Sequence, residues 1–327
     1  MIDVVFLLLP GSLILDWAGP AEALRIANGL LREQGKAAPF ALRFAASRPE
    51  SISSVGVQLA GLEALPATLA PHSWLVLVGQ TGSRISIDSL DTRALLDWLR
   101  PLQLAPDRLE LVTICAGAVL AAHAGLLAGR RATTHHHHLD ELQSVAQACD
   151  VVRNRVFVED SPVYSSAGVT TGIDLILHRI DAICGPALAA QVAQTMVVAL
   201  RRGPHDPELS PFLAYRNHVH PALHRVQDAV SQSPQSDWSV PGMAAVGHTS
   251  PRHLTRLFLE YAQIAPLQYL RRIRLAVAQT ALASGDSVTQ AAAAAGFSSD
   301  TQLRRAWQHF AVPGTPSRPT GEACLSR

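Results

Sequence analysis

Two stretches near the end of the chain share one pattern, SVPGMAAVGHTSPRHLTRLF at Ser239–Phe258 and SVTQAAAAAGFSSDTQLRRAW at Ser287–Trp307. Each begins with Ser-Val and continues with a small alanine-rich helix, a turn that contains glycine, a serine, and a second helix that carries arginines. This order is that of a helix-turn-helix, whose second helix can enter the major groove of DNA. The duplication predicts an all-α domain with two such units, joined by a long helix at Leu267–Ala283.

The second helix of each copy should have one buried face and one exposed face. Apolar residues recur at helical core spacing in both, after a serine that is suited to cap the helix. The exposed faces then carry the residues predicted to contact DNA: Arg252, Thr255, Arg256, Thr301, Gln302, Arg304 and Arg305. Arginine can pair with guanine, and glutamine with adenine, through two hydrogen bonds. Arg271, Arg272 and Arg274 of the joining helix are expected to contact phosphates instead.

Charge is divided unevenly along the 327 residues. Residues 211–327 carry 11 arginines against 6 acidic residues, a net charge of +5, whereas residues 1–210 carry a net charge of −4. A basic module beside a mildly acidic one is typical of a nucleic-acid reader with an attached control domain.

Composition limits the class of protein further. Apolar residues make up 48% of the chain and charged residues 16%, which favours folded domains over disorder. No apolar run reaches the ~18–20 residues that span a bilayer, and the run VVFLLLP at residues 4–10 indicates a buried strand. The four cysteines, at positions 115, 149, 184 and 324, lack paired spacing. We therefore expect a reduced, cytoplasmic protein without a membrane segment.

The first part of the chain alternates short apolar runs with helical stretches, which predicts a parallel-sheet α/β sandwich of the flavodoxin-like type. The predicted strands are Asp3–Leu9, Ala41–Ala46, Trp74–Val78, Glu110–Ile114, Val156–Glu159 and Val163–Ser166. The predicted helices are Gly19–Glu33, Asp91–Leu99, Gly117–Ala124, His138–Ala148, Gly172–Cys184 and Ala187–Leu200. We expect one domain at 1–200, a proline-rich linker at 201–215 and the helical domain at 216–316, with a frayed tail from Pro313.

The helical part resembles the DNA-binding domains of AraC-type regulators over about residues 216–312. The pieces that carry the resemblance are RHLTRLF, then AQIAPLQYLRRIRLAVAQTAL, then SVTQAAAAAGFSSDTQLRRAW. The family positions that reach bases fall on Arg252, Thr255, Arg256, Thr301, Gln302 and Arg305. The first turn departs from the family, because its glycine, Gly247, stands one place early and is followed by His248. The resemblance implies binding to double-stranded DNA, and RNA polymerase is a further candidate partner.

A second informative segment is LVTICAGAVLAAHAGLLAGRRATTH at Leu111–His135, in which an apolar strand leads into Cys115, a turn of small residues and a helix. Such an elbow places a side chain above the sheet at a helix N-terminus. Together with LLLPGSLILDWAGPAEAL and SSAGVTTGIDLILH, it resembles the PfpI-like branch of the class I glutamine-amidotransferase-like superfamily over about residues 3–200. A PfpI-like domain followed by an AraC-type domain is the arrangement of the bacterial regulators called GlxA-like. The resemblance therefore implies a transcriptional regulator.

Cys115 is open to three interpretations, as a catalytic nucleophile, as part of a ligand pocket, or as a structural residue. Covalent catalysis needs a base within hydrogen-bond reach of the thiol. In the PfpI proteases that base is the histidine after the cysteine, and here Ala116 stands in its place. Asp16 matches the acid that isonitrile hydratases place near their cysteine. We expect no catalytic residue and no enzyme activity, with an isonitrile-hydratase-like or amidase-like enzyme that carries a DNA-binding appendage as the alternative.

The ligand pocket is expected at the carboxyl ends of the strands, where open α/β sheets bind ligands. Thr171 is expected to cap a helix whose free amide groups could hold a carboxylate. The predicted effector-binding residues are Asp16, Gly19, Pro20, Gly79, Cys115, Ala116, Thr170, Thr171 and Gly172. The resemblance implies a small nitrogenous effector such as an amino acid or a betaine, and no cofactor is expected.

Four consecutive histidines, His135–His138, form a conspicuous run. We expect no metal site there, because adjacent histidines in a loop should point in different directions and no Cys or Glu has ligand spacing around them.

The two halves together predict a regulator that binds double-stranded DNA with one domain and a small effector with the other. The first domain is expected to form a homodimer. A DNA-binding protein whose first domain only dimerises, and senses nothing, is the remaining alternative.

Overall fold

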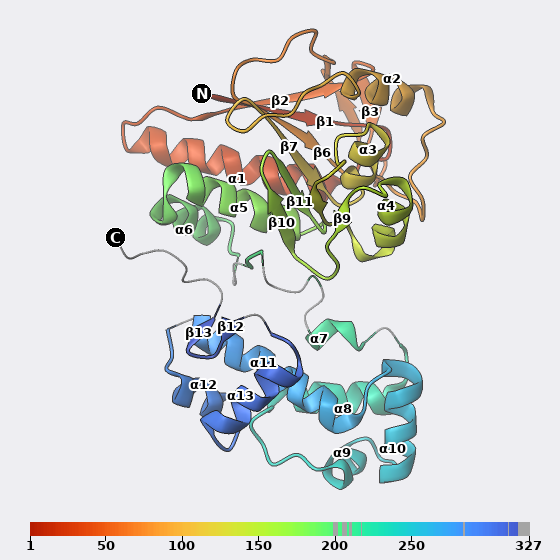
Figure 1. Cartoon of the computed structure of the whole chain (residues 1–327), viewed down its shortest axis with the longest axis vertical. Helices are drawn as coiled ribbons and strands as arrows, with labels where there is room; N and C mark the ends of the chain where they lie inside the picture. Colours follow the sequence, from red (N-terminus) through yellow and green to blue (C-terminus); the bar gives the residue numbers. More distant parts are fainter. Residues whose placement is uncertain are drawn as a thin grey trace. The chain divides into compact units, whose positions relative to one another are not determined.

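The structure is a computed structural model that describes residues 1–198, 202–204, 208, 211–216, 218–283, 285–312 and 314–319 (Figure 1). The chain divides into two compact units, Met1–Glu208 and Leu209–Arg327. Parts of the predicted linker, at 201, 205–207 and 209–210, lie outside the described residues, and so does 199–200 at the end of a predicted helix. None of the helices in the described ranges has the length and apolar character needed to cross a bilayer.

The first unit is built on a seven-stranded sheet with the order β10-β11-β7-β6-β1-β2-β5. Its strands are β1 (Ile2–Leu7), β2 (Phe40–Ala46), β5 (Glu63–Ala64), β6 (Ser73–Leu77), β7 (Leu109–Ile114), β10 (Phe157–Asp160) and β11 (Val163–Ser166). All neighbours pair in parallel except β10 and β11, which form an antiparallel edge. Two small separate sheets pair β3 (Glu50–Ile52) with β4 (Gln58–Ala60), and β8 (Arg131–Ala132) with β9 (Asp150–Val151). The predicted α/β fold is thus confirmed.

Helices cover this sheet on both faces. They are α1 (Ile14–Glu33), α2 (Leu90–Leu99), α3 (Gly117–His123), α4 (Leu139–Val145), α5 (Thr171–Cys184) and α6 (Pro186–Thr195). Helices α1, α5 and α6 pack against one another, and α2, α3 and α4 form a second group (Figure 1). Across the sheet, the step from β1 to β2 goes toward the β5 edge and the step from β6 to β7 goes toward the β10 edge. Because both crossovers are right-handed, α1 and α2 lie on opposite faces of the sheet. The central strands are buried along their length, which explains their continuous apolar sequence.

The predicted elements of the first unit are present, with strand ends shifted by one or two residues. Helix α1 starts at Ile14, well before the predicted start at Gly19. Pro20 consequently lies inside the helix rather than in its first turn. Helix α4 is shorter than predicted, since Ala146 leaves the helical conformation.

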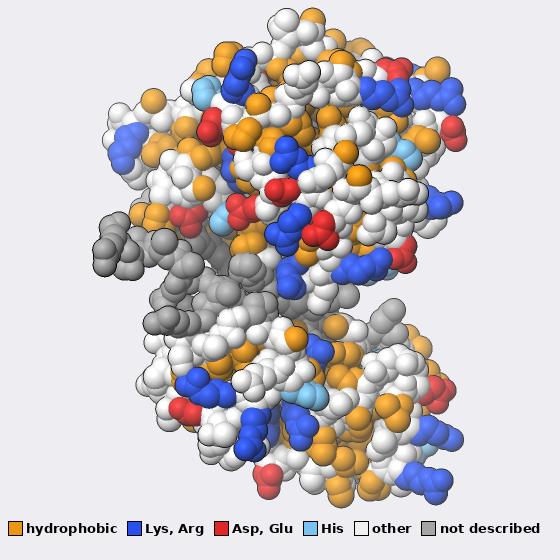
Figure 2. Space-filling view, in the orientation of Figure 1, with side chains coloured by type: hydrophobic (Ala, Val, Ile, Leu, Met, Phe, Trp, Pro, Cys, Tyr) orange, Lys and Arg blue, Asp and Glu red, His pale blue; other side chains and the backbone are white. Residues whose placement is uncertain are grey.

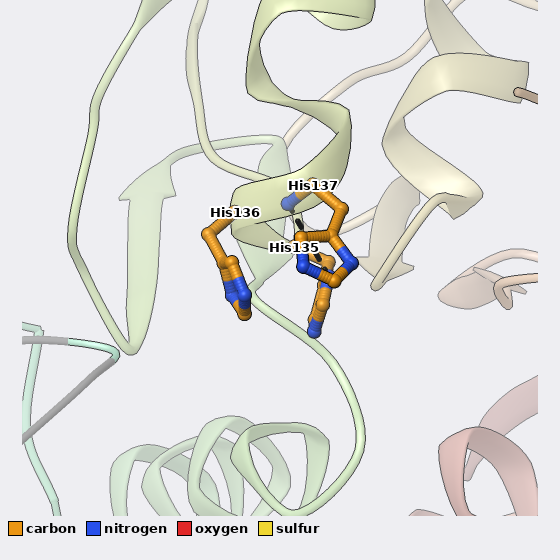
Figure 3. Close-up of side chains that lie close together, drawn as sticks. All are labelled: His135, His136 and His137. Carbon is orange, nitrogen blue, oxygen red and sulfur yellow. Dashed lines mark hydrogen bonds between the residues drawn. The ribbon is translucent and has the colours of Figure 1, made fainter. Parts of the chain in front are cut away.

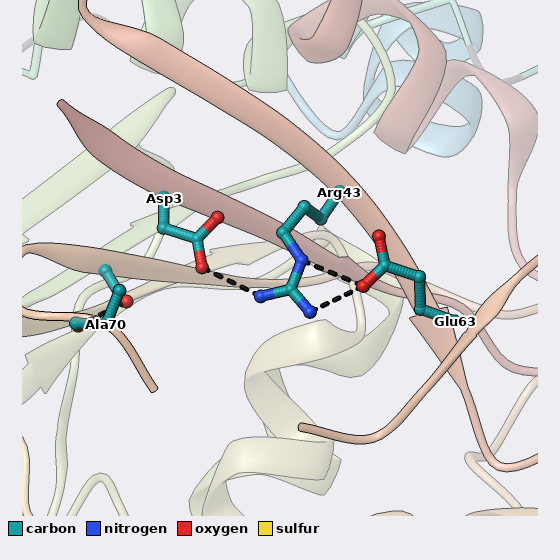
Figure 4. A network of polar contacts seen from close by, with 5 residues as sticks. Asp3, Arg43, Glu63 and Ala70 are labelled. Atoms are coloured by element: carbon teal, nitrogen blue, oxygen red, sulfur yellow. Dashed lines mark hydrogen bonds and ion pairs between the residues drawn. The ribbon is translucent and has the colours of Figure 1, made fainter. Parts of the chain in front are cut away.

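One arginine joins three strands at the β2–β5 edge of the sheet (Figure 4). Arg43 stands on β2 and donates from Nη1 to Asp3 Oδ2 on β1 at 3.0 Å, and from Nε to Glu63 Oε2 on β5 at 2.8 Å. These side chains are partly exposed, so each pair should stabilise the fold by only ~0.2–1 kcal/mol. The contact adds to the backbone pairing of β5 with β2, and β5, with two residues, is too short to show any periodicity in the sequence.

The second unit is helical, as predicted. Its described helices are α7 (Pro211–Ala214), α8 (Pro221–Gln232), α9 (Val240–Val246), α10 (Pro251–Leu257), α11 (Pro266–Ala283), α12 (Val288–Ala294) and α13 (Asp300–His309). A turn of π-helix, η2 (Phe258–Ala262), continues α10. The pairs α9–α10 and α12–α13 are the two predicted helix-turn-helix units.

Helix α11 contributes to the cores of both helix-turn-helix units. Tyr269 and Ile273 in its first half pack with residues of α8, α9 and α10, whereas Leu275 and Ala278 pack with residues of α12 and α13. A helix of 18 residues is ~27 Å long. One helix therefore joins the two helix-turn-helix units, and its length is comparable with the ~34 Å between successive major grooves.

The end of the second unit differs from the prediction. Residues Gly314–Thr315 (β12) and Arg318–Pro319 (β13) pair as an antiparallel hairpin instead of fraying. Ser317 in this hairpin accepts a hydrogen bond from Arg304 Nη2 of α13 at 2.7 Å, which ties the hairpin to the helix. Pro313 and residues 320–327 lie outside the described residues.

Candidate functional site

Serine residues cap both predicted recognition helices, α10 and α13. Ser250 Oγ accepts from the His253 amide, and Ser299 Oγ accepts from the Gln302 amide, both at 3.3 Å. A side-chain oxygen at this position satisfies an amide that has no partner within the helix. Leu254 on α10 and its counterparts on α13 are buried in the cores, so the opposite faces are turned outward, as predicted.

The outward face of α10 carries Arg252 and Arg256, and both are exposed. Thr255 is only half-buried, and its Oγ1 donates to the carbonyl oxygen of Pro251 at 2.9 Å. Arg256 Nη2 lies 3.0 Å from His253 Nδ1. Within the described residues Arg252 has no side-chain hydrogen bond or ion pair, which leaves its guanidinium available to a ligand.

The predicted residues on α13 are all exposed, but two of them have partners in their own unit. Gln302 Oε1 accepts from the amide and the hydroxyl of Ser298, at 2.8 and 3.3 Å. Arg304 donates to the hairpin serine described above. Thr301 and Arg305 have no side-chain partner in the described part of the chain. A glutamine uses both ends of its amide to pair with adenine, so the contact at Gln302 competes with base reading.

Two of the three α11 arginines that are expected to contact phosphates have contacts within their own unit. Arg274 is half-buried and donates from Nε and Nη2 to two backbone carbonyl oxygens of the α8–α9 loop, both at 2.8 Å. Burial lowers the pKa of Arg274. The guanidinium of Arg272 lies over the ring of Phe310, 4.3 Å from its centroid. Of the three, Arg271 is exposed and remains suited to a phosphate.

A cavity of about 590 Å³ lies between α11 and α13. Arg271, Gln302, Arg305 and His309 are among the side chains that line it. Figure 2 shows basic side chains in groups on the α12–α13 side and on the α9–α10 side of this unit. Exposed positive charge therefore accompanies both recognition helices, as binding to a polyanion requires.

The two helix-turn-helix turns have the same backbone bonds but different residues. His248 and Gly296 occupy equivalent places, and each donates its amide to the carbonyl oxygen three residues earlier. Both have left-handed φ values, 51° and 80°. Glycine adopts this conformation readily, whereas other residues adopt it at a cost of ~1–2 kcal/mol. A Cβ on Gly296 would lie 2.4 Å from Gln235 Cα, so the second turn accepts glycine alone.

In the first unit, Cys115 follows β7 directly and precedes α3, in the predicted elbow. Its φ of 56° lies in the left-handed region. Gly117 lets the chain pass close to β6, because a Cβ there would lie 2.2 Å from the carbonyl oxygen of Leu77. Asp16 and Gly79 come after β1 and β6, the neighbouring strands at which the direction of winding reverses. This switch point at the carboxyl ends of strands is where open α/β sheets bind ligands.

Asp16 holds this edge together. Its Oδ1 accepts from the amide of Val169 at 2.7 Å, and its Oδ2 accepts from the amide of Gly79 at 3.1 Å. The Cys115 thiol is a third hydrogen-bond partner. Burial raises the pKa of Asp16, and these hydrogen bonds oppose the rise. Among the described residues no cationic side chain pairs with Asp16, so a buried carboxyl group stands here without a counter-charge.

The thiol of Cys115 is buried and protonated. Cys115 is 4% exposed, and a Cβ added to Gly79 or Gly168 would lie 2.8 or 2.3 Å from its Cβ. Burial, followed by the charge of Asp16, raises the pKa of the thiol far above its usual range. The reactive form of cysteine is the thiolate. The elbow therefore lacks an activated nucleophile.

The remaining predicted effector residues lie along the same edge and are mostly packed. The buried ones are Pro20, Ala116, Thr171 and Gly172. Gly19 is half-buried, and a Cβ there would lie 2.8 Å from Ile173 Cγ1. Thr170 and Val169 are exposed, and Val169 has a left-handed φ of 53°. Positive φ in a β-branched residue is a strained conformation, and such strain gathers at binding sites.

The start of α5 differs from the prediction. Thr170 rather than Thr171 occupies the cap position, and Thr171 Oγ1 donates to the carbonyl oxygen of Gly168 at 2.9 Å. Arg202 Nε donates to Asp174 Oδ2, and its Nη2 donates to Thr170 Oγ1, both at 2.9 Å. The carboxylate in the first turn of this helix is thus that of Asp174, a residue of the chain, and not that of a ligand. Sequence reasoning missed Arg202 because it lies in the segment assigned to the linker.

The histidine run also differs from the prediction. His135 precedes a turn of 3-10 helix, η1 (His136–His138). Potential ligand nitrogens of His135, His136 and His137 lie within 4.8 Å of one another, so the expectation that the rings diverge is wrong (Figure 3). Burial and the neighbouring histidines lower the pKa of His135 to about 4, which keeps its ring neutral near pH 7.

Comparison with known families separates the same two parts of the chain. Residues 69–182 match the DJ-1/PfpI family, and residues 243–311 match a helix-turn-helix domain. The elbow at Cys115 falls in the first match, and both recognition helices fall in the second.

Two curated relatives are similar to the chain over nearly its whole length. The HTH-type transcriptional regulator CdhR of Pseudomonas aeruginosa is 29% identical, over 97% of this chain and 91% of the relative. The HTH-type transcriptional regulator GlxA of Rhizobium meliloti is 28% identical, over 97% of this chain and 95% of the relative. The crystal structure of an AraC family transcriptional regulator from Pseudomonas putida matches 60% of this chain and 100% of its own, with a TM-score of 0.51 and 20% identity, which shows a shared fold.

Proposed function

The chain belongs to the transcriptional regulators that join a DJ-1/PfpI domain to an AraC-type helix-turn-helix domain, and we propose which of its residues bind DNA and effector. In this proposal α10 and α13 read base pairs, and the strand edge around Asp16 binds a small nitrogenous effector. The chain acts in the cytoplasm as a homodimer. The relatives that match nearly its whole length are named transcriptional regulators, and the buried, protonated Cys115 supports a role without catalysis.

The observation that carries the DNA proposal is the exposure of arginines on both recognition helices. Arg252 and Arg305 have no side-chain partner within the described residues, so their guanidinium groups are free to bind base edges. A bidentate pair with guanine contributes ~1–3 kcal/mol of discrimination. Thr255, Arg256 and Thr301 complete the proposed surface. Gln302 and Arg304 are expected to contribute less, because each already has a partner in its own unit.

The DNA proposal is tested by fluorescence anisotropy with the full-length chain and a duplex from the region upstream of its own gene. Arg305→Ala should weaken specific binding by ~1–3 kcal/mol, or roughly 5–150-fold. Arg304→Ala is a matched control, because it removes the same charge from the neighbouring residue and should weaken binding less. Equal losses in the two variants, or unchanged binding by Arg305→Ala, would reject the proposed role of α13.

The effector proposal rests on the strand edge where Asp16 lies. A buried carboxyl group without a counter-charge favours a ligand with a positive nitrogen. The strained backbones of Cys115 and Val169 adjoin it, and Thr170 is exposed beside them. Gly19, Pro20, Gly79, Ala116, Thr171 and Gly172 complete the proposed site.

A thermal-shift screen of the full-length chain with amino acids and betaines tests this proposal. A ligand at 100 times its Kd stabilises the folded state by ~2.7 kcal/mol. Thr170→Tyr places a bulky side chain at the exposed end of the site and should abolish the response. Thr170→Ala is the matched control, because it loses the same hydrogen bond from Arg202 without adding bulk and should keep the response. The proposed site is rejected if no compound raises the melting temperature, or if Thr170→Tyr responds as the wild type does.

The proposed homodimer would allow two copies to bind half-sites spaced by whole turns of the duplex. Analytical ultracentrifugation at micromolar concentration tests it, and a chain that binds its operator as a monomer contradicts it. Contact with RNA polymerase is proposed as well. In transcription with purified polymerase, the DNA-bound chain should change the rate of initiation, and an unchanged rate contradicts the contact.

A further inference from the structure

Three imidazole rings surround one small volume at the start of α4 (Figure 3). The ring centroid of His136 lies 4.1 Å from that of His135 and 4.3 Å from that of His137. One potential ligand nitrogen from each ring lies within 4.8 Å of the other two. All three residues come from a single turn, so no large movement of the chain is needed to unite them around an ion.

The distances suit a transition-metal ion after small side-chain rotations. Zn²⁺ binds imidazole nitrogen at ~2.0–2.1 Å, which places tetrahedral ligand nitrogens roughly 3.3–3.4 Å apart. His137 is exposed, and His135 and His136 are half-buried, so the rings have room to turn and an ion can reach them. His135 must exchange one weak contact, because its Nδ1 lies 3.4 Å from the backbone nitrogen of His137.

A buried carboxylate orients one of these rings. Glu208 Oε1 lies 2.8 Å from His136 Nδ1 and also accepts the backbone amide of His136 at 3.0 Å. The Glu208 side chain is 6% exposed. A carboxylate that accepts Nδ1–H fixes the tautomer in which Nε2 has its lone pair free, as is usual for histidines that bind metals. This contact is independent of the crowding of the rings.

His138, the last residue of the run, is arranged differently. Its Nδ1 lies 2.7 Å from Glu141 Oε2, and both side chains are buried. Its ring centroid is 6.4 Å from that of His135. His138 therefore anchors the turn to α4 and is not part of the ligand set.

We propose that His135, His136 and His137 form a three-histidine site for a divalent transition-metal ion such as Zn²⁺, with Glu208 as the residue that positions His136. Three neutral imidazoles are a nitrogen donor set that suits Zn²⁺, Ni²⁺ and Cu²⁺ and is a poor one for Mg²⁺ or Ca²⁺. Three protein ligands leave the fourth tetrahedral position to water or to an exchangeable ligand.

The site also has a position from which it can affect the rest of the chain. Glu208 is the last residue of the first unit, and the second unit begins at Leu209. An ion that holds His136 holds its carboxylate partner as well, and so fixes the point at which the chain leaves the first unit. A metal ion bound at this turn would thereby add a second input to the regulator besides its effector.

Isothermal titration of the metal-free, full-length chain with ZnCl₂ tests the site directly, in a preparation without an added histidine tag. One Zn²⁺ should bind per chain. His137→Ala should weaken binding at least tenfold, and Glu208→Gln should weaken it by roughly 10–100-fold while one ion per chain still binds. His72→Ala, which removes an exposed histidine of the same unit, should leave the affinity unchanged.

Loss of folding is excluded by the melting temperature without metal, which should be the same for His137→Ala and wild type because His137 is exposed. Binding of less than one ion per chain contradicts the proposal. So does an affinity that His137→Ala and Glu208→Gln leave unchanged. Because neither DNA nor effector is present, failure of the metal site is distinguishable from failure of the proposed DNA and effector sites.

Discussion

Replacing His248 with glycine should stabilise the second unit. His248 has a φ of 51°, in the conformation that its counterpart Gly296 adopts at 80°. A residue with a Cβ is strained there by ~1–2 kcal/mol, and glycine gives back ~0.5–1 kcal/mol through the greater entropy of its unfolded chain. The His248 side chain is exposed, so little packing is lost. The expected net gain for His248→Gly is about 0.5–1 kcal/mol.

Differential scanning calorimetry of the full-length chain measures this gain. The transition of the second unit is identified as the one that operator DNA shifts upward. A gain of this size in a unit of about a hundred residues should raise its melting temperature by roughly 2–6 °C. His248→Ala is the matched control, because it removes the imidazole but keeps the Cβ and hence the strain. A stabilisation by His248→Ala equal to that by His248→Gly, or none by His248→Gly, would refute the backbone explanation.

Three further outcomes are expected. Asp16→Asn replaces an acceptor oxygen with a donor that faces a backbone amide, and should destabilise the first unit by ~1–3 kcal/mol in urea denaturation. An unchanged free energy of unfolding would show that Asp16 has no structural role. Because the pKa of Cys115 is raised, the unfolded chain loses a thiol proton above pH ~8.5 that the native chain keeps. Between pH 9 and 10 the wild type should therefore lose about 1 kcal/mol more stability than Cys115→Ala. Parallel pH profiles of the two proteins would contradict this. Arg274→Ala should cost ~1–2 kcal/mol of stability through two lost hydrogen bonds. Arg271→Ala should leave the melting temperature unchanged and lower the slope of log affinity for DNA against log salt concentration by about 1. A reversed result would overturn the roles assigned to these two arginines.

The fold could be predicted because its elements are long and patterned. Strand β6 is buried on both faces and therefore has an uninterrupted apolar sequence, WLVL within Ser73–Leu77. The duplicated serine-capped helices identified the second unit in the same way. Strand β5 has two residues and is held by pairing with β2 and by the Arg43–Glu63 contact. These interactions join residues distant in the sequence and leave no local pattern.

The candidate sites could be predicted only in part. Asp16, Gly79 and Cys115 follow strands β1, β6 and β7, and the topology brings such positions together. Arg202 reaches Asp174 from a segment that has no regular pattern. The clustering of His135–His137 was not predicted, because consecutive residues of an extended loop point in different directions, whereas a 3-10 turn brings them together.

Asp16 links two backbone segments with left-handed residues, one of which is the elbow at Cys115. The backbone amide of Val169, a residue in the left-handed conformation, donates a hydrogen bond to the Asp16 carboxyl group. The same carboxyl group is hydrogen-bonded to the thiol of Cys115, whose backbone is also in the left-handed region. A single buried carboxyl group thus contacts two segments whose left-handed residues cost ~1–2 kcal/mol each. A ligand with a positive nitrogen that pairs with Asp16 would compete with these hydrogen bonds and relax one or both segments, whereas an anion would be repelled. Because a ligand shifts an equilibrium only by its differential affinity for the two states, we expect the response of this chain to depend on the cationic group of its effector.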